Sequence, residues 1–421
     1  MSFTYFKEGS FSSLFAEDTS DGNYGFILNY PSTASWAIYP NYKKYFIQDG
    51  SEEATKASYD KLCQKEPWKN LAVLGDDITG IIFKSPRNVL VSYWQEQFGY
   101  KYNNIETLER KIYLDYLNQS PKYDKLITLF PFDSLLPKKH AVDPDAHYQL
   151  LSKTSLAETE VQAPKYNTYD VNETSIDEIK ITHDFPYLVK VSHGLSGEGT
   201  YIIKSASDLD YCIREMKKYY YNQLLDYIII SDFVKNEVQN YCVQFYVSKS
   251  GQVTLIGATS QMVTSEGKFL GGLIHYEGVD MSKFTTIITK VSAYAHEKGY
   301  FGVIGCDVLE DKDGGLHVID INYRVNGSTP LCLQRHRLLE SGKSVAKYSG
   351  DYQMNGTLDE ILVTLKPELD KKDFLILSVL EKVKYGKIYT DIYGIVAGKD
   401  TKEMLLVEEK LAQKGLRIVS N

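Results

Sequence analysis

The most informative stretch of this sequence is YFGVIGCDVLEDKDGGLHVIDINYRVNG, which covers residues 300–327. Two apolar runs flank Asp313-Gly314, a favoured two-residue turn between antiparallel strands. The pattern therefore predicts a β-hairpin. With these two residues at the centre of the turn, Asp307 lies directly opposite Asp320. A turn one residue later along the chain would move the two aspartates apart.

One face of this hairpin collects oxygen ligands. Opposed residues have Cβ atoms ~5 Å apart, and two carboxylates so close repel each other unless a proton or cation lies between them. Asn322 and Arg324 follow Asp320 at every second position, so they share its face. Carboxylate and amide oxygens suit Mg²⁺, which makes Asp307, Asp320 and Asn322 candidate metal ligands. The alternative is an exposed face with solvated charges, and the apolar residues around the pair argue against it.

Length and composition indicate a globular protein with more than one domain. The chain has 421 residues, 43% of them hydrophobic and 24% charged, which excludes a disordered, collagen-like or coiled-coil protein. At roughly 100–200 residues per domain, this length predicts two to four domains. The net charge of −8 argues against binding to bulk DNA or RNA, because nucleic-acid-binding surfaces are basic.

The cysteines and the apolar segments predict a cytoplasmic protein with no membrane contact. Five cysteines form no CxxC pair, which predicts reduced and mostly buried thiols. No apolar run reaches the ~18 residues of a membrane span. The first residues lack the apolar core of a secretion signal.

A glycine-rich loop follows a predicted strand that ends near Lys190. The loop reads Gly194-Leu-Ser-Gly-Glu-Gly199. Glycines let backbone N–H groups approach phosphate oxygens, and the lysine adds a positive charge. The pattern is neither a P-loop nor a dinucleotide fingerprint, and a plain turn between strands is the alternative interpretation.

A third motif is the segment Ile228-Ile-Ile-Ser-Asp-Phe-Val-Lys-Asn-Glu237. A buried strand breaks here into polar residues, which can leave backbone N–H and C=O groups free to bind an adenine ring. A strand that simply leaves the core would give the same pattern.

The order and spacing of these motifs resemble the ATP-grasp family over about 180 residues, from Lys153 to Gln334. The most specific element is the run Asp-x-Asn-x-Arg after an upstream aspartate. The resemblance implies ATP and Mg²⁺ as cofactors, with Asp307, Asp320 and Asn322 as metal ligands. The residues that it implies for nucleotide binding are Lys153, Lys190, Gly194, Ser196, Gly197, Gly199, Asp232, Phe233, Val234, Glu237 and Asn240.

Three positions depart from the pattern of the family. The family usually has glutamate where this chain has Asp320, and aspartate is one methylene shorter. The contact to ribose is ambiguous between Glu237 and Asn240. Gly305 stands where the D-alanine ligase branch has arginine, which argues against that branch.

The expected fold class is α/β, with an α+β ATP-grasp part. Residues 1–145 are expected to form an N-terminal α/β domain with a largely parallel sheet, similar to the pre-ATP-grasp domain of amino-acid and peptide ligases. Residues 146–345 are expected to form the two-lobed ATP-grasp domain. Residues 346–421 are expected to form a small C-terminal α/β cap. In the first domain, the sequence predicts strands at 71–75, 88–92 and 126–130 and a helix over 105–117.

The resemblance also implies a reaction. A carboxylate is activated as an acyl phosphate, an amine then attacks it, and ADP and phosphate leave. Lys190 and Arg324 are the expected catalytic residues, with the lysine on the transferring phosphate and the arginine on the oxyanion or leaving phosphate. Two alternatives stay open: a ligase with a thiol or carrier-protein acceptor, and a pseudo-enzyme that binds ATP without turnover.

The substrates are less well marked by the sequence. Among the histidines, His275 is the first candidate for a catalytic group, ahead of His193 and His336. Arg335 and Arg337 are candidates for binding a substrate carboxylate. The expected partners are a small carboxylate and a small amine, amino acids among them, with a homodimer as the common state of relatives.

Overall fold

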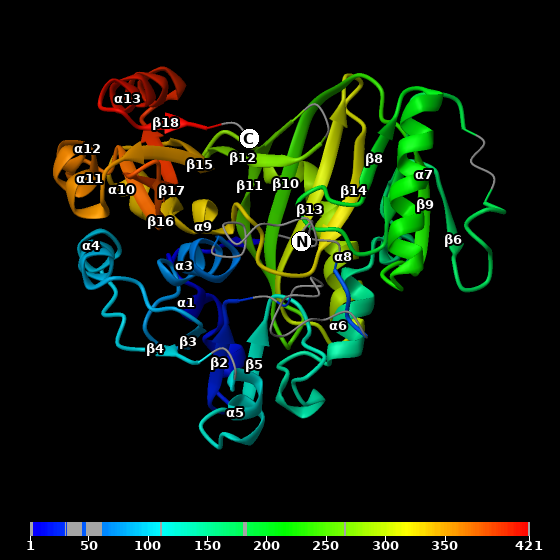
Figure 1. Cartoon of the computed structure of the whole chain (residues 1–421), viewed down its shortest axis with the longest axis horizontal. Helices are drawn as coiled ribbons and strands as arrows, with labels where there is room; N and C mark the ends of the chain where they lie inside the picture. The colour runs from blue at the N-terminus through cyan, green and yellow to red at the C-terminus, as the bar shows by residue number, and fades with distance from the viewer. Residues whose placement is uncertain are drawn as a thin grey trace.

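The computed structural model describes residues 3–29, 31, 44–47, 61–109, 112–179, 183–264 and 267–419. Within these residues the chain forms three sheets, of ten, four and four strands. The N-terminal sheet lies below one side of the large central sheet, and the third sheet lies on the opposite side (Figure 1). No helix in this part of the chain is both long and apolar enough to cross a bilayer. Four of the five cysteines are buried.

The N-terminal sheet is parallel, as predicted. Its strand order is β4-β3-β2-β5, and every pairing in it is parallel. The predicted strand at 126–130 is confirmed. The strands and helices of this domain are β2 (Tyr24–Ile27), β3 (Thr79–Ile82), β4 (Ile105–Thr107), β5 (Lys125–Thr128), α1 (Phe11–Phe15), α3 (Glu66–Leu71), α4 (Asn88–Phe98) and α5 (Tyr113–Gln119).

Three other predictions in this domain are wrong. Residues 88–92 open helix α4, residues 71–75 lie at and after the end of α3, and residues 105–117 divide into β4 and the start of α5. The buried residues of α4 include Leu90, Tyr93, Trp94 and Phe98, which is helical spacing. A window of five apolar residues is too short to show that period, so it looks the same as a buried strand.

The central sheet carries both the predicted hairpin and the C-terminal strands. Its order is β14-β13-β10-β11-β12-β15-β17-β16, with β1 beside β11 and β18 beside β15. The strands of residues 345–418 therefore extend this sheet. The strands are β1 (Thr4–Tyr5), β10 (Glu237–Val247), β11 (Val253–Val263), β12 (Phe269–His275), β13 (Gly302–Asp311), β14 (Leu316–Asn322), β15 (Val345–Asn355), β16 (Phe374–Lys384), β17 (Lys387–Gly398) and β18 (Arg417–Ile418).

Helices surround this sheet (Figure 1). Helix α8 buries an apolar face that includes Ile288 and Val291 against the hairpin strands. The helices are α6 (Pro144–Leu151), α8 (Thr285–Glu297), α9 (Thr329–Leu333), α10 (Arg335–Glu340), α11 (Leu358–Thr364), α12 (Lys366–Asp370) and α13 (Thr401–Gln413).

The third sheet is a small antiparallel lobe. Its order is β6-β9-β7-β8, and helix α7 (Ala206–Tyr221) packs on it through Cys212 and Met216. The strands are β6 (Tyr166–Asp170), β7 (Tyr187–Val191), β8 (Thr200–Ile203) and β9 (Tyr227–Asp232). The predicted strand that ends near Lys190 is confirmed as β7, and the buried strand predicted before the polar residues of the third motif is confirmed as β9. The lobe and the central sheet form the two sides of the site described below.

The 300–322 hairpin is confirmed, but its turn is not the predicted one. Asp311 N donates to Gly315 O at 3.0 Å, so the loop has three residues and not two. The register shifts by one residue between Asp307 and Val308, which leaves Ile319 as an extra residue on β14. The bulge compensates for the longer turn, and Asp307 pairs with Asp320 after all.

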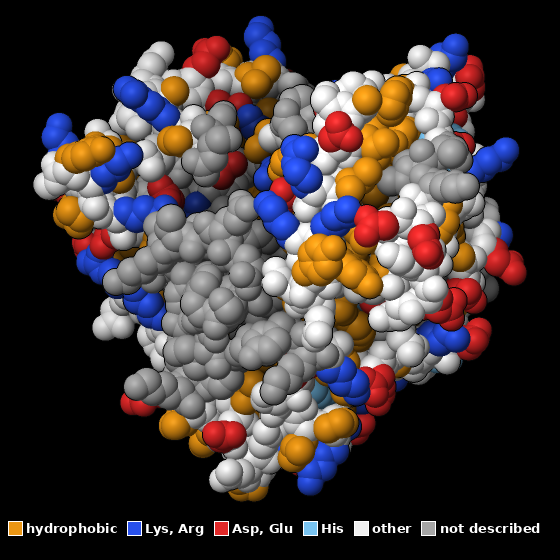
Figure 2. Space-filling model, turned by 45° about the vertical axis from the view of Figure 1, so that its right-hand side comes forward, with side chains coloured by type: hydrophobic (Ala, Val, Ile, Leu, Met, Phe, Trp, Pro, Cys, Tyr) orange, Lys and Arg blue, Asp and Glu red, His pale blue; other side chains and the backbone are white. Residues whose placement is uncertain are grey.

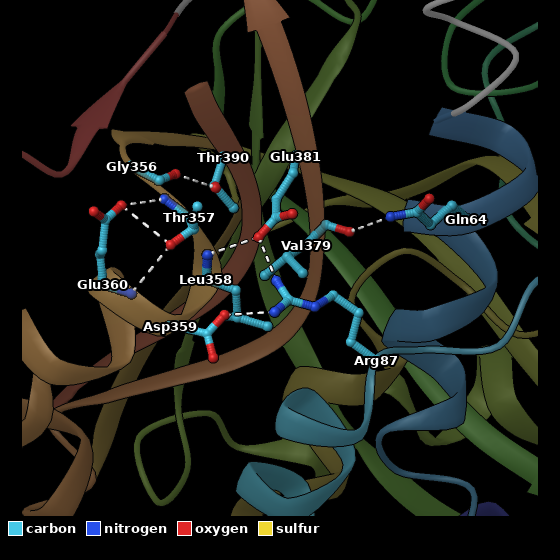
Figure 3. Close-up of polar contacts among 10 residues, drawn as sticks. All are labelled: Gln64, Arg87, Gly356, Thr357, Leu358, Asp359, Glu360, Val379, Glu381 and Thr390. Carbon is cyan, nitrogen blue, oxygen red and sulfur yellow. Dashed lines mark hydrogen bonds and ion pairs between the residues drawn. The ribbon is translucent and has the colours of Figure 1, made fainter. Parts of the chain in front are cut away.

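The outermost strand of the central sheet, β16, is covered by the N-terminal domain. Gln64 Nε2 donates to Val379 O at 3.1 Å, and Trp94 Nε1 donates to Ile376 O at 3.1 Å. Arg87 reaches across to Glu381 on β16 and Asp359 on α11 (Figure 3). An edge strand with its backbone groups satisfied this way is protected from pairing with another chain.

The buried hydrogen bond of Trp94 should stabilise the contact between the N-terminal domain and β16 more than the exposed ion pairs of Arg87 do. We expect Trp94→Phe to lower the free energy of unfolding by about 1–3 kcal/mol, because it leaves the buried Ile376 carbonyl without its donor. We expect Arg87→Met to cost less than about 1 kcal/mol, because the Arg87 side chain is 48% exposed. Urea unfolding of both variants tests this order, and an equal loss would show that the ion pairs hold the junction.

Candidate active site

A cavity of about 580 Å³ lies where the three sheets meet. This volume is in the usual range for sites that bind small molecules. The hairpin β13–β14 forms one wall. The glycine-rich loop 194–199 and residues 232–234 of the small antiparallel lobe form another. Leu28, Leu129 and Phe130, which follow strands β2 and β5, complete the lining from the N-terminal domain. Ligand sites at the carboxyl ends of parallel strands are common in α/β folds.

The paired aspartates lie in this cavity. Gln261 Nε2 donates to Asp307 Oδ1 at 2.9 Å, and Lys153 Nζ donates to Asp320 Oδ2 at 2.5 Å. Burial, together with the neighbouring Asp320, raises the pKa of Asp307 to about 7. Lys153 opposes the effect of burial on Asp320 and lowers the pKa of that carboxyl. Two carboxylates held this close are suited to bind a divalent cation, because the cation relieves their repulsion.

Asn322 completes the oxygen set. Its Nδ2 lies 3.4 Å from Asp307 Oδ2, and its Oδ1 accepts from Arg324 NH2 at 2.7 Å. Two carboxylates and one amide oxygen on adjacent strands are hard ligands of the kind that Mg²⁺ takes, with water or phosphate oxygens for the rest of its shell. The residues present therefore fit a magnesium ion.

Two lysines from separate elements point at the same end of the cavity. Ser152 is extended and separates α6 from a short 3₁₀ helix, Lys153–Thr159. The break lets Lys153 N donate to Ser192 O at 2.8 Å, beside the end of β7. Lys190 lies on β7 of the small lobe and reaches β14 of the central sheet, where its Nζ donates to the carbonyl oxygen of the bulged residue Ile319 at 3.1 Å.

The position of Lys190 beside Lys153 suits an anionic ligand. Burial and the nearby Lys153 lower the pKa of Lys190 to about 8. A bound polyanion would raise this pKa and stabilise the ammonium form, because opposite charge favours ionisation. Two such lysines beside a pair of metal-ligand carboxylates fit the phosphates of a nucleotide.

The glycine-rich loop joins β7 to β8 and arches over the cavity. Gly194, Ser196 and Gly197 line it, whereas Gly199 lies beneath the loop against Val191. Gly197 has φ +91°, and a Cβ there would lie 2.9 Å from Gly267 O on the loop between β11 and β12. The two loops also join through Glu198 and Lys268, whose Oε1 and Nζ are 2.9 Å apart.

A side chain at residue 197 should therefore weaken loop closure. We expect Gly197→Ala to lower kcat/KM for ATP about tenfold, because a strained backbone conformation costs roughly 1–3 kcal/mol. The thermal midpoint of unfolding should change little, since the loop lies outside the cores. Steady-state kinetics at varied ATP concentration, with Gly251→Ala in a distant hairpin turn as control, test the effect. Equal losses in both variants would mean that the loop plays no special part.

The predicted adenine hinge lies at the other end of this cavity. Strand β9 ends at Asp232, and Asp232, Phe233 and Val234 all line the cavity. Glu237 and Asn240 at the start of β10 line it too, so the structure keeps both as candidates for the ribose contact.

Arg324 is positioned by its neighbours on the hairpin and by the N-terminal domain. Its NH1 donates to Val325 O at 3.1 Å, and its guanidinium lies 5.2 Å from the centre of the Phe130 ring. The side chain lines the cavity next to the aspartate pair. A fixed cation at this place can hold an oxyanion or a phosphate.

The predicted histidines lie outside this cavity. His275 is at the far end of β12, about 17 Å along the strand from Leu270, which does line the cavity. His193 stacks on Tyr148 with ring centres 3.9 Å apart, and both of its ring nitrogens have partners. His336 lies on the surface beside Glu340. The spacing of residues along the sequence does not show which end of a strand borders a site. For this reason His275 was predicted in the site, although it lies at the end of β12 away from the cavity.

The two arginines proposed for a substrate carboxylate also lie elsewhere. Arg335 packs on the ring of Tyr5 and donates to Tyr276 O at 3.3 Å. Arg337 donates to Phe98 O and to Gln334 Oε1, and packs against Tyr100. Both are structural contacts between the domains.

Sequence reasoning missed several residues of the cavity. Gln261 on β11 donates to Asp307, and no motif in the sequence marks it. A polar wall from the N-terminal domain and β17 carries no motif at all. That wall consists of Glu66, Lys69, Asn70 and Tyr393.

Comparison with known proteins agrees with this geometry. Residues 164–322 match the family model described as L-aspartate–L-methionine ligase, ATP grasp. An ADP complex of N5-carboxyaminoimidazole ribonucleotide synthetase has a TM-score of 0.56 at 11% identity, over 93% of this chain and 96% of that chain. L-amino acid ligase from Bacillus licheniformis has a TM-score of 0.53 at 12% identity, over 95% and 98%.

A third structure was solved with a metal nucleotide. It is the MgADP complex of the biotin carboxylase domain of 2-oxoglutarate carboxylase from Hydrogenobacter thermophilus, with a TM-score of 0.51 at 11% identity, over 94% of this chain and 91% of that chain. These structures share the fold, and the family model covers the segment that carries most of the nucleotide and metal residues. The chain therefore carries a segment at residues 164–322 that matches an ATP-grasp ligase family, and it shares the fold of the three solved structures over most of its length.

Proposed function

We propose that this ligase joins the carboxylate of one amino acid to the amino group of another, with conversion of ATP to ADP and phosphate. The observation that carries the proposal is the convergence of the aspartate pair, two lysines and Arg324 on a single cavity that extends to the N-terminal domain. The match to an L-aspartate–L-methionine ligase family and the similarity to an L-amino acid ligase support amino acids as substrates.

In this proposal, different groups of cavity residues bind the phosphates, the adenine, the ribose and the metal. Lys153 and Lys190 hold the phosphates, the hinge Asp232–Val234 holds the adenine, and Glu237 or Asn240 holds the ribose. Asp307, Asp320 and Asn322 hold the metal, which when bound supplies positive charge to the transferring phosphoryl group. The loop 194–199 covers the phosphates and excludes water.

The reaction has two steps. A carboxylate oxygen of the first substrate forms a bond to the γ-phosphorus of ATP, the bond to the bridging oxygen of ADP breaks, and an acyl phosphate results. The amine of the second substrate then forms a bond to the acyl carbon and loses a proton, and phosphate leaves with one oxygen from the original carboxylate. Arg324 is placed to stabilise negative charge on the acyl group or on the leaving phosphate.

Release of ADP from Mg-ATP tests this function. The protein is incubated with all twenty L-amino acids together and then with pairs, and mass spectrometry identifies the product. We expect ADP only when two particular amino acids are present, with a dipeptide of their combined mass less one water. ADP with one amino acid alone would favour a separate acceptor such as a carrier-protein thiol. ATP binding without ADP in any mixture would overturn the proposal.

A further inference from the structure

Asp351 is a carboxylate of the cavity that the nucleotide and metal residues do not explain. It lies on β15 at a register shift between Ser349 and Tyr352. Its backbone is bonded, since Asp351 N donates to Ser349 Oγ at 3.2 Å and Asp351 O accepts from Val419 N at 2.8 Å. The carboxylate lines the cavity, yet it forms no ion pair or hydrogen bond within the described part of the chain. A partly buried charge without a partner costs free energy, so it indicates a cationic ligand.

The lysines near this carboxylate are bonded to other groups. Lys69 Nζ pairs with Glu66 Oε2 at 2.5 Å, and Lys65 donates to the carbonyl oxygen of Gly350. Neither lysine forms an ion pair with Asp351 among the residues that the structure describes. The charge of Glu66 is therefore balanced by direct contact, whereas the carboxylate of Asp351 faces the cavity without a counter-ion.

The hydroxyl of Tyr348 lies beside this carboxylate. Tyr348 is 1% exposed and lines the cavity, and its ring stacks on Tyr393 with ring centres 5.8 Å apart. Burial raises the pKa of Tyr348 well above its ordinary value, and the charges of Glu66 and Asp351 raise it further, so the phenol stays neutral. Buried hydroxyl groups usually have a hydrogen-bond partner, but in the described part of the chain Tyr348 Oη has none.

The pairing of β12 with β15 places these two groups near the reacting centre. Ser349 pairs with Gly271 on β12, two residues from Phe269. The Phe269 ring packs on Gly327, where an added Cβ would lie 2.9 Å from the ring. Gly327 follows Arg324 by three residues, and both line the same cavity as Phe269. The two unpartnered groups and the arginine therefore border one cavity through a short series of contacts.

We propose that Asp351 and Tyr348 bind the ammonium group of the amino acid whose carboxylate is activated. The Asp351 carboxylate is the counter-ion, and the Tyr348 hydroxyl oxygen is a second acceptor. An ammonium group offers three N–H donors and one positive charge, which matches two acceptors that lack partners. The inference rests on the proposed function and names the class of one of its substrates.

The chemistry of the second step argues against the amine of the other substrate as the ligand. That amine must be uncharged to attack the acyl carbon, and a neighbouring carboxylate favours the charged form. The amino group that stays an ammonium throughout belongs to the substrate that supplies the carboxylate. Asp351 therefore selects an amino acid over a simple acid at this position.

The first test compares an amino acid with the acid that lacks its amino group. L-aspartate and succinate form such a pair, and the corresponding pair is used for whichever amino acid supplies the carboxylate in the pairwise assay. Release of ADP is measured with Mg-ATP and the same acceptor amino acid. We expect kcat/KM to be at least about 100-fold higher for the amino acid, because a site built to bind a polar group rejects an analogue that lacks it. Equal use of both acids would overturn the inference.

Asp351→Asn assigns this preference to a residue. We expect the KM for the activated amino acid to rise about 10- to 100-fold, while the KM for ATP stays the same, because only the ammonium loses its counter-ion. The kcat/KM for the deaminated acid should stay within about twofold of wild type, whereas damage to the fold would lower it together with the value for the amino acid. An unchanged KM for the amino acid would contradict the proposed role.

Tyr348→Phe is the second variant, because it removes the hydroxyl and keeps the ring that stacks on Tyr393. We expect the KM for the activated amino acid to rise about 3- to 10-fold, as for the loss of one hydrogen bond. Asp359→Asn is the matched control, since Asp359 is an exposed acid on α11 outside the cavity. Equal changes in Asp359→Asn and Asp351→Asn would show a general effect of charge and overturn the assignment.

The failure of this inference can be told apart from the failure of the proposed function. Absence of ADP from every amino-acid mixture with wild-type protein would refute the proposed function. Formation of ADP from an amino-acid pair, with equal use of the deaminated acid, would overturn only the ammonium site.

Discussion

An Asp307→Asn variant is expected to unfold at a higher temperature than the wild-type protein in the absence of divalent cations, and to lose ligase activity at least about 100-fold. The stability change follows from the pairing of Asp307 with Asp320 on adjacent strands, inside a cavity. Burial and this like charge raise the pKa of Asp307 to about 7. The neutral amide removes the repulsion, but it also removes a metal ligand, so the activity falls.

The stability difference should depend on pH in a defined direction. In the unfolded chain an aspartate has a pKa of about 3.9. Between that pH and about 7 the folded wild-type protein binds the extra proton, so the contribution of Asp307 to stability falls as the pH rises. The advantage of Asp307→Asn should therefore be small near pH 4, grow across this window and level off above it.

Thermal unfolding with EDTA and with Mg²⁺ measures both effects. We expect Mg²⁺ to stabilise the wild-type protein, since a ligand that binds only the folded state raises stability, and to do less for the variant. An Asp307→Asn protein that is less stable than wild type at pH 8 in EDTA would contradict the account of the pair.

The second large effect is expected at Arg324. Arg324→Met should lower kcat by about 100- to 1000-fold, the usual cost of removing one group that stabilises charge in the transition state. The binding of ATP should change little, because the phosphate lysines come from other elements. Methionine keeps the aliphatic packing on the Phe130 ring, which Arg324 covers at 5.2 Å.

Arg335→Met is the matched control. Arg335 lies outside the cavity, on the ring of Tyr5, so its replacement should leave kcat within about twofold of wild type. Steady-state kinetics with the established amino-acid pair compare the two variants, and fluorescence titration measures ATP binding. Similar kcat values for Arg324→Met and wild type would remove Arg324 from the reacting centre.

The hairpin shows what a sequence can predict about a site. Its apolar runs and its Asp-Gly turn signal are local, so the hairpin and the pairing of Asp307 with Asp320 could be predicted. The turn proved one residue longer, and the bulge at Ile319 restored the register. That bulge also exposes the carbonyl that Lys190 contacts, a link between two lobes that no local pattern shows.

Other elements were beyond prediction for physical reasons. Residues 88–92 are apolar enough for a strand, and only the burial of Trp94 and Phe98 further along shows the helical period. The strands after residue 345 look like a separate cap, because a sequence does not reveal which sheet edge a strand will join. The polar wall of the cavity depends on packing between domains, so Asn70 and Lys69 resemble ordinary helix residues until the fold places them at the cavity.

The most direct test of the central claim follows an oxygen atom. The carboxylate substrate is labelled with ¹⁸O, the ligase reaction is run with Mg-ATP and the amino-acid pair, and the released phosphate is analysed by ³¹P NMR or mass spectrometry. Activation as an acyl phosphate predicts one ¹⁸O in the phosphate for each ADP formed. Product formation with unlabelled phosphate would show that the carboxylate never attacks phosphorus, and it would contradict the account.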